Sequence, residues 1–344
     1  MSAPLLSVRD LRTWFFTDQG VAKAVDGISF EVHEGETLGI VGESGCGKTV
    51  TSLSVLGLLP QPPARIMDGS SVRFRGEELV GSGDRRLREL RGNEVSMIFQ
   101  EPMSSLNPVY SVGDQIAEAL RLHRGLDKRA ARARTVQLLD EVGIPEPERR
   151  LDEYPHQLSG GMRQRVMIAM ALSCEPKLLI ADEPTTALDV TIQAQILELL
   201  AELRASHGMA VLLITHDLGV VAEVCDRVVV MYAGQVVETG TVHEIFASPA
   251  HPYTRALLES LPAVDDPRKR LVSIPGTVPN PTDWPQGCRF LARCSLAREG
   301  CEIPQELRGM GESGRATRCW IGRDGPGPAA RSGGAGSTGP GMQA

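Results

Sequence analysis

Gly42-Glu43-Ser44-Gly45-Cys46-Gly47-Lys48-Thr49 is the stretch that decides the fold of this chain. Two glycines with four residues between them are followed by Lys and Thr, which is the pattern of a loop that cradles phosphate groups. The apolar run from Thr37 to Val41 before the loop predicts a buried strand, and the apolar run from Val50 to Leu59 after it predicts a helix. Strand, loop and helix in this order predict a bound nucleoside triphosphate.

Each part of this loop has a chemical reason. Glycines allow backbone N–H groups to turn toward phosphates, and the N-terminus of the following helix adds partial positive charge. Lys48 is expected to bring its charge to the terminal phosphates, and the hydroxyl of Thr49 to bind Mg²⁺. The alternative is a glycine-rich turn before an ordinary helix, and the completely filled pattern disfavours it.

A second apolar run, Leu178 to Ala181, ends in the acid pair Asp182 and Glu183. Such a run is expected of a central strand in a parallel sheet, which delivers the acids to the carboxyl edge where ligands bind. Asp182 is expected to hold Mg²⁺ through its water shell, and Glu183 to accept a proton from an attacking water. Because paired acids also begin many ordinary loops, this pair is not decisive alone.

The segment Leu158-Ser159-Gly160-Gly161-Met162-Arg163-Gln164 predicts another helix start. A Ser cap and two glycines lead into a helical segment from Met162 to Ser173. An exposed helix N-terminus attracts anions, so this segment is a second candidate phosphate contact.

With these motifs the chain resembles the ATP-binding cassette family of nucleotidases. The resemblance implies an α/β fold: a P-loop NTPase core with an antiparallel β subdomain, a helical subdomain and, here, a small Cys-rich C-terminal module. Leu158 to Gln164 looks like the signature motif of this family, which implies that it binds the γ-phosphate of a nucleotide held by the opposing subunit. A single chain would then form an incomplete site.

The resemblance also gives roles to single residues that stand in the family order along the chain. Phe15 is the match for the aromatic that stacks on adenine, with Trp14 and Phe16 as alternatives. Gln100 matches the glutamine that senses Mg²⁺ and the transmembrane partner, and His216 the histidine that contacts the γ-phosphate. In isolation each of these would pass for a core or loop residue, but the conserved order from residue 15 to residue 216 makes chance a poor explanation.

The complete site that the resemblance implies has four groups. The ATP-binding group is Phe15, Gly42, Glu43, Ser44, Gly45, Cys46, Gly47, Lys48, Thr49 and Asp182. The catalytic groups are Glu183, His216 and Gln100, and the Mg²⁺ ligands are Thr49, Gln100 and Asp182. The contacts across the dimer come from Ser159, Gly160, Gly161 and Gln164, and from Asp189 in the D-loop segment Ala187-Leu188-Asp189.

Longer segments look like the ATPases of peptide importers, and more like their "D" type subunit than their "F" type. These segments are Ser52 to Pro60, Gln100 to Pro108, Tyr154 to Gln157 and His251 to Leu258. The resemblance implies a heterodimer with a second ATPase, two permease subunits and an extracytoplasmic binding protein, at the cytoplasmic face of the membrane. Import of nickel or another small solute remains an alternative. A non-transport ATPase acting on DNA or ribosomes is disfavoured, because the chain holds one cassette and no long insertion.

The expected organisation is a nucleotide-binding domain at 5–260, with its helical subdomain at about 101–175, an importer extension at 261–321 and a disordered tail at 322–344. Residues 5 to about 99 read as strands and turns around the first helix. No apolar run approaches the roughly 18 residues of a membrane span, and no signal peptide is evident. A net charge of −7 disfavours a nucleic-acid surface.

Four cysteines crowd the proline-rich C-terminal segment: Cys288, Cys294, Cys301 and Cys319. So small a segment needs a crosslink or a metal, and a reducing cytosol disfavours disulfides. Zinc modules usually contain two ligands only two to four residues apart, which this segment lacks. Wider spacing suits a [4Fe–4S] cluster, and the segment resembles the extension of peptide importer ATPases that holds one. We therefore expect the cluster, with Zn²⁺ as the alternative.

Overall fold

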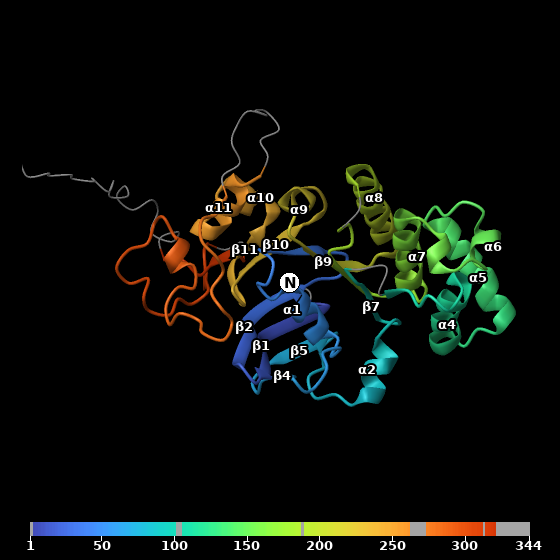
Figure 1. Cartoon of the computed structure of the whole chain (residues 1–344), viewed down its shortest axis with the longest axis horizontal. Coiled ribbons are helices and arrows are strands. Elements are labelled where there is room, and N and C mark those ends of the chain that lie inside the picture. The colour runs from blue at the N-terminus through green and yellow to red at the C-terminus, as the bar shows by residue number, and fades with distance from the viewer. Residues whose placement is uncertain (1–2, 101–104, 187–188, 262–272, 312–313, 321–344) are drawn as a thin grey trace, which may run out of the picture.

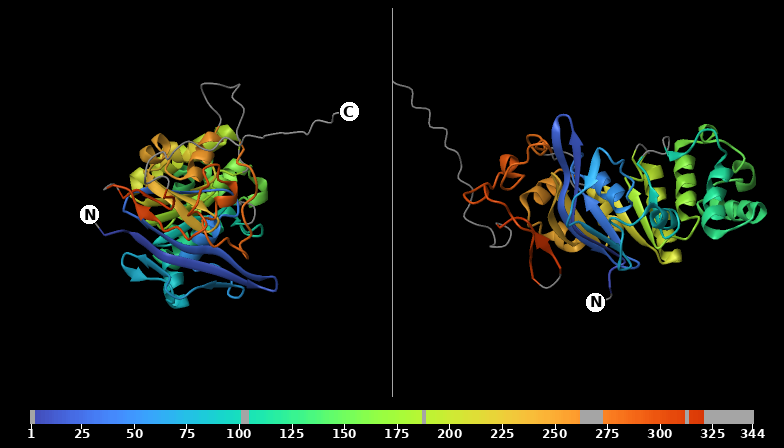
Figure 2. Two further views of the ribbon diagram at one scale, coloured as in Figure 1. Left: turned by 90° about the vertical axis from the view of Figure 1, so that its left-hand side faces the viewer. Right: turned by 90° about the horizontal axis from the view of Figure 1, so that it is seen from below.

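Two β-sheets and their covering helices make up the computed structural model, which describes residues 3–100, 105–186, 189–261, 273–311 and 314–320 (Figure 1). The molecule is elongated, with a helical region at one end, the C-terminal segment at the other and the sheets between them (Figure 2). The expected tail at 322–344 lies outside the described residues. None of the helices in the described ranges combines the length and apolar character that crossing a bilayer requires.

The central sheet has the strand order β12-β13-β11-β10-β3-β9-β8-β7. Its bounds are β3 (Thr37–Val41), β7 (Val95–Ile98), β8 (Leu178–Asp182), β9 (Ala210–Thr215), β10 (Arg227–Tyr232), β11 (Gln235–Thr241), β12 (Arg308–Gly309) and β13 (Ala316–Thr317). The strands from β10 to β7 are all parallel, so their carboxyl ends meet at one edge. The sequence-predicted strands that precede the phosphate loop, the acid pair and His216 are thus neighbours.

Burial on both faces explains why these strands are continuously apolar. Leu179 and Ala181 of β8 pack into a hydrophobic cluster with the helical region, whereas Leu178 and Ile180 pack into a second cluster on the other face. Successive strand residues point to opposite faces, and each face of this sheet is covered. The predicted parallel α/β core is confirmed.

The second sheet is antiparallel and packs against α1, as expected for the antiparallel part of the fold. Its strands are β1 (Leu6–Thr17), β2 (Gly20–Val32), β4 (Ala64–Ile66), β5 (Ser71–Phe74) and β6 (Glu77–Glu78), in the order β2-β1-β5-β6 with β4 also paired to β1. Leu11, Ile28 and Val72 bring this sheet into the same hydrophobic cluster as Val55 of α1.

The remaining helices cover the central sheet or form the helical region. They are α1 (Lys48–Val55), α2 (Asp84–Leu90), α4 (Val112–Arg124), α5 (Lys128–Glu141), α6 (Pro147–Arg150), α7 (Gly160–Leu172), α8 (Val190–His207), α9 (Leu218–Val224), α10 (Val242–Ala247) and α11 (Pro252–Glu259), with 3₁₀ turns η1 (Pro155–Gln157) and η2 (Leu291–Arg293). Helices α4 to α7 lie together at one end of the molecule (Figure 1).

Two sequence expectations about helices were wrong in detail. Helix α1 ends at Val55 instead of continuing to Leu59, because Gly57 turns the chain at φ 60° and Arg91 donates to the carbonyls of Leu56 and Gly57. Helix α2 was not predicted at all. It is one short, highly charged helix in a region that reads as strands and turns, and its two leucines are its only buried residues.

The C-terminal segment continues the central sheet, which the sequence did not predict. β13 pairs antiparallel with β11, with Thr317 opposite Glu238, and β12 pairs with β13. Phe290 of the same segment packs against the rings of Tyr232 and Tyr253, with centroids 5.3 and 5.4 Å away. The cysteine-bearing segment is therefore joined to the α/β core by both backbone and aromatic contacts.

Candidate functional site

The phosphate-loop residues 42–47 connect β3 to α1 and press closely against other backbone. A Cβ atom at Gly47, where φ is 103°, would lie 2.4 Å from the carbonyl oxygen of Ala24. A Cβ atom at Gly42 would lie 2.2 Å from the carbonyl oxygen of Met231. Both positions therefore require glycine on steric grounds, as the motif predicts.

Lys48 begins α1 with its side chain buried inside the loop. Its Nζ donates to the carbonyl oxygens of Gly42 at 2.7 Å and Glu43 at 3.2 Å. An ammonium group held by two carbonyl oxygens has a defined position beside the loop. It can exchange these partners for phosphate oxygens without leaving the site.

Asp182 lies at the end of β8 with only 1% of its surface exposed. Its two carboxylate oxygens lie 3.3 Å from the Thr49 hydroxyl and 3.5 Å from the Ser52 hydroxyl. Burial raises the pKa of Asp182 to about 6, and the Thr49 hydrogen bond opposes this shift. A buried carboxylate surrounded by hydroxyl oxygens fits the oxygen ligands that Mg²⁺ prefers.

Three side chains from different elements converge on the carboxylate of Glu183. Gln100 after β7 donates its amide at 3.2 Å, Thr186 donates its hydroxyl at 2.9 Å, and Nδ1 of His216 after β9 lies 3.3 Å away. The backbone N–H of Glu183 donates to the Ile214 carbonyl at 2.8 Å, which fixes the residue against β9. The edge of the parallel sheet thus brings Gln100 together with residues that follow it by 83 positions and more.

The remaining predicted residues lie elsewhere in the fold. Phe15 is half-buried at an irregularity of β1, opposite Ala22 of β2. Asp189 caps α8 by accepting the Ile192 N–H at 3.0 Å, while Ala187 and Leu188 lie outside the described residues.

The signature segment begins α7. Ser159 caps this helix by accepting the N–H of Met162 at 3.3 Å, and both Ser159 and Gly160 are exposed. Gln164 differs from them, because its side chain is buried within this chain. None of these residues contacts the phosphate loop in the part of the chain that the structure describes.

Two residues near the phosphate loop were missed by sequence reasoning. Tyr253 of α11 accepts the backbone N–H of Glu43 at 2.8 Å, and Arg293 forms an ion pair with the Glu43 carboxylate at 2.6 Å. They lie 210 and 250 residues from their partner, and neither belongs to a motif that points to the loop.

None of the four C-terminal cysteines, which all lie in described parts of one segment, forms a disulfide. The N–H of Cys288 donates to the carbonyl of Cys301 at 2.8 Å. Burial raises the pKa of Cys288 to about 11, and the neighbouring thiols of Cys294, Cys319 and Cys301 raise it further. Across the described ranges, however, no three His, Cys, Asp or Glu side chains are grouped as ligands of a metal ion. The side-chain geometry therefore does not fit a bound metal as it stands.

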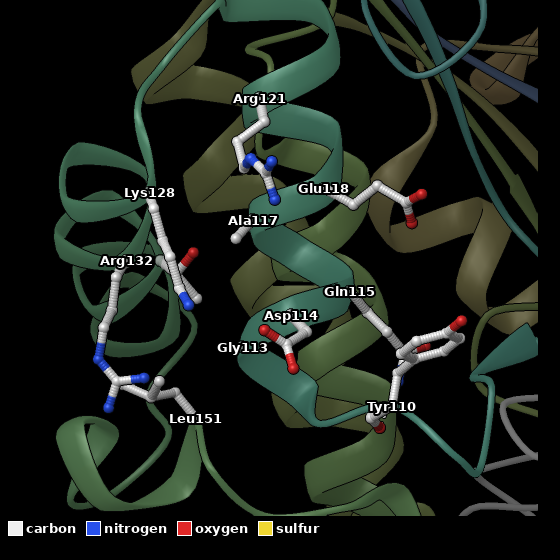
Figure 3. Close-up of a pocket in the computed structure, with 11 residues that line it drawn as sticks. Tyr110, Gly113, Asp114, Gln115, Ala117, Glu118, Arg121, Lys128, Arg132 and Leu151 are labelled. Atoms are coloured by element: carbon white, nitrogen blue, oxygen red, sulfur yellow. Dashed lines mark hydrogen bonds between the residues drawn. The ribbon is translucent and has the colours of Figure 1, made fainter.

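An open cavity lies away from the phosphate loop, between α4 and α5 (Figure 3). It measures about 360 Å³ and carries Asp114 and Glu118 on α4 and Lys128 and Arg132 on α5. None of the residues that line it belongs to the predicted nucleotide site.

The parallel sheet edge, the glycine-confined phosphate loop and the paired acids define the chain as an ATP-binding cassette ATPase. Sequence comparison agrees: the family "ABC transporter" matches residues 25–186, and "Oligopeptide/dipeptide transporter, C-terminal region" matches residues 237–301. The oligopeptide transport ATP-binding protein AppD of Bacillus subtilis is 53% identical over 317 residues, covering 92% of this chain and 96% of AppD. The dipeptide transport ATP-binding protein DppD of Escherichia coli is 53% identical over 315 residues, with the same coverage.

The chain belongs to the ATP-binding subunits of the peptide importers in the ABC transporter family. It is the ATP-hydrolysing subunit of such an importer and works with membrane permeases. A dimeric ATP-binding cassette bound to ADP and Pi has a TM-score of 0.62 at 26% identity, covering 69% of this chain and 98% of its own. cbiO1 from Clostridium perfringens, part of the transporter complex cbiONQ, has a TM-score of 0.60 at 30% identity, covering 72% and 92%.

Proposed function

We propose that ATP hydrolysis by this importer subunit takes place at the sheet edge where β3, β7, β8 and β9 end, with Glu183 as the general base. The observation that carries this proposal is the convergence of Gln100, Thr186 and His216 on the Glu183 carboxylate. Three oriented neighbours give the carboxylate a defined position, which general-base catalysis needs.

The proposed step transfers the γ-phosphoryl group of ATP to water. The water oxygen bonds to the γ-phosphorus, the bond to the bridging oxygen breaks, Glu183 takes the proton, and ADP and phosphate leave. Lys48 balances the charge on the phosphates, and His216 orients Glu183 and contacts the γ-phosphate. Thr49, Asp182 and Gln100 would hold Mg²⁺, which supplies charge neutralisation when bound. Phe15 and the loop residues Gly42 to Gly47 bind the rest of the nucleotide.

A second subunit is proposed to complete the site. Ser159 and Gly160 are exposed at the start of α7, where backbone N–H groups are available to an anion. We assign Ser159, Gly160 and Gly161 to the nucleotide of the partner, with Asp189 near the same interface. Gln164, whose side chain is buried within this chain, is proposed as the last residue of the same signature contact.

The partners that we propose are a different ATPase of the same family, two permeases and an extracytoplasmic binding protein, with this chain at the cytoplasmic face of the membrane and no nucleic acid bound. Val109 and Tyr110, just before α4, are 71% and 55% exposed and offer an apolar contact for a permease. We keep 5–260 as the nucleotide-binding domain, with 101–175 as its helical subdomain, and 261–321 as the importer extension.

We also propose that the four cysteines bind a metal centre, a [4Fe–4S] cluster or alternatively Zn²⁺. The placement of all four cysteines in one segment, where the Cys288 N–H donates to the Cys301 carbonyl, supports this, although their side chains would have to regroup. Protein purified without oxygen should contain about four irons per chain. One zinc per chain, or no metal, would overturn the cluster.

The catalytic proposal is tested by two substitutions measured for nucleotide affinity. Glu183→Gln should bind ATP as the wild type does, because it keeps the shape and hydrogen bonding of the side chain while removing the base. Lys48→Ala should lose most affinity, because it removes the cation beside the phosphates. Equal affinity of Lys48→Ala and wild type would refute the placement of the nucleotide.

A further inference from the structure

The turn from Cys288 to Cys294 directs two arginines toward the nucleotide-binding part of the chain. The carbonyl of Cys288 accepts the N–H of Leu291 at 3.0 Å, and the carbonyl of Leu291 accepts the N–H of Cys294 at 3.2 Å, so the turn is closed by its own backbone. Arg289 and Arg293 leave this turn with side chains that are 8% and 5% exposed. Arginines this deeply buried are held in one conformation by their partners.

Arg293 binds the phosphate loop directly. Its Nη1 and Nη2 donate to Oε2 and Oε1 of Glu43 at 2.6 and 2.9 Å. Nε donates to the carbonyl of Pro275 at 2.9 Å, and Nη1 also lies 3.2 Å from the Tyr232 hydroxyl. A bidentate Arg–carboxylate pair fixes the distance between the two side chains and their relative orientation. Further hydrogen bonds to the guanidinium restrict it more.

The backbone of Glu43 takes part in the same arrangement. Its N–H donates to the Tyr253 hydroxyl at 2.8 Å, and its carbonyl accepts Nζ of Lys48 at 3.2 Å and the N–H of Cys46 at 3.3 Å. Glu43 therefore contacts Arg293 through its side chain and the ammonium group of Lys48 through its backbone carbonyl. A displacement of Glu43 would move a carbonyl on which the loop geometry depends.

Arg289 contacts the residues that pack against the other side of the phosphate loop. It donates to the carboxylate of Asp26 in β2 and to the carbonyl of Ala233 in the β10–β11 turn. Asp26 donates its N–H to the Gly234 carbonyl at 2.9 Å, and Gly234 donates its N–H to the Cys46 carbonyl at 3.0 Å. The loop is thus held on two sides by residues of one turn.

We propose that Arg293 is a positioning residue for the phosphate loop, so that the turn between Cys288 and Cys294 sets the affinity of the chain for ATP. The inference rests on the nucleotide site proposed above. Because coupling between two sites is reciprocal, bound ATP must stabilise this turn by as much as the turn stabilises bound ATP.

The test measures ATP affinity of the full chain for Arg293→Ala, Glu43→Gln, the double variant and the rescue variant Arg293→Lys. Each single variant should weaken ATP binding by about fivefold or more. The double variant should be no weaker than the worse single one, because both remove the same ion pair. Arg293→Lys should recover part of the loss. Glu43→Gln leaves the C-terminal segment unchanged, so it gives an answer even if Arg293→Ala folds poorly.

The change in hydrogen exchange of residues 288–294 on adding ATP supplies a readout that separates a positioning role from general destabilisation. ATP should slow exchange there in the wild type and not in Arg293→Ala. The matched control is Arg308→Ala, an exposed arginine of the same segment that pairs with the exposed Glu306, and its ATP affinity should be unchanged. Wild-type affinity in both Arg293→Ala and Glu43→Gln, or additive losses in the double variant, would overturn the proposal. Unimpaired binding by Lys48→Ala would instead overturn the nucleotide site itself.

Discussion

Glu183 holds a backbone conformation that residues other than glycine rarely adopt. Its φ of 46° is left-handed, which costs on the order of 1–3 kcal/mol and persists only where the surroundings impose it. Here the N–H is bound by the Ile214 carbonyl, and the carboxylate by Gln100, Thr186 and His216. Local strain at a residue with three convergent partners agrees with the catalytic role proposed for it.

His251 should make the stability of the chain depend on pH. Burial lowers the pKa of this histidine to about 3, and the charge of Arg318 lowers it further. Since an unfolded histidine titrates near 6.5, its neutral form contributes full stability above that pH, and this contribution declines as the pH falls toward 3, by at most about 1.4 kcal/mol per pH unit.

The check is urea unfolding of wild type and His251→Asn at pH 7.5 and pH 5. Asn keeps an acceptor for the Tyr253 N–H at the start of α11, so the helix cap is preserved. The wild type should lose more stability between the two pH values than the variant does. Equal losses would show that His251 titrates normally in the folded protein.

The residues that sequence could identify are those that follow a strand within a short motif. Asp182 and Glu183 stand at the end of an apolar run, and β8 ends at Asp182, whereas Lys48 follows the glycine-rich loop and begins α1. The contact between Arg293 and Glu43 could not be predicted, because it joins residues 250 positions apart. Only the packing of the C-terminal segment against the core brings them together.

At the scale of elements, the pairing of β13 with β11 connects the C-terminal segment to the core. Glu238 of β11 is fully buried and accepts the N–H groups of Ala250 and His251, both at 2.8 Å. Arg315, just before β13, supplies the balancing charge at 3.1 Å. Sequence periodicity could not reveal β12 and β13, since strands of two residues are shorter than any readable pattern.

Arg315→Met should therefore destabilise the folded chain by about 3 kcal/mol, because it leaves a buried carboxylate without its cation. Chemical denaturation measures the effect, with Arg308→Met as the exposed control that should change little. A loss no larger than that of the control would mean that the backbone donors alone satisfy Glu238.

At the scale of the whole molecule, the phosphate loop and the signature segment belong to different regions of an elongated chain. The helical region that carries α7 lies at one end, and the phosphate loop lies in the middle (Figure 1). Their separation within the described residues supports the proposal that another subunit completes the site. The α/β core between them could be predicted from the sequence because its strands are continuously apolar and parallel.

The isolated chain should accordingly hydrolyse ATP slowly, and adding the second ATPase and the permeases should raise the rate. The comparison is a steady-state ATPase assay at matched concentrations of this chain. Full activity from a sample that is monomeric by light scattering would show that the site is complete within one subunit.

The most direct measurement of the central claim is ATP turnover and peptide uptake by the assembled transporter carrying Glu183→Gln in this chain. General-base catalysis typically contributes about 10²- to 10⁴-fold, so turnover at this site should fall by that order while ATP still binds. Peptide uptake should fall with it. Wild-type turnover and uptake by the Glu183→Gln transporter would contradict the account.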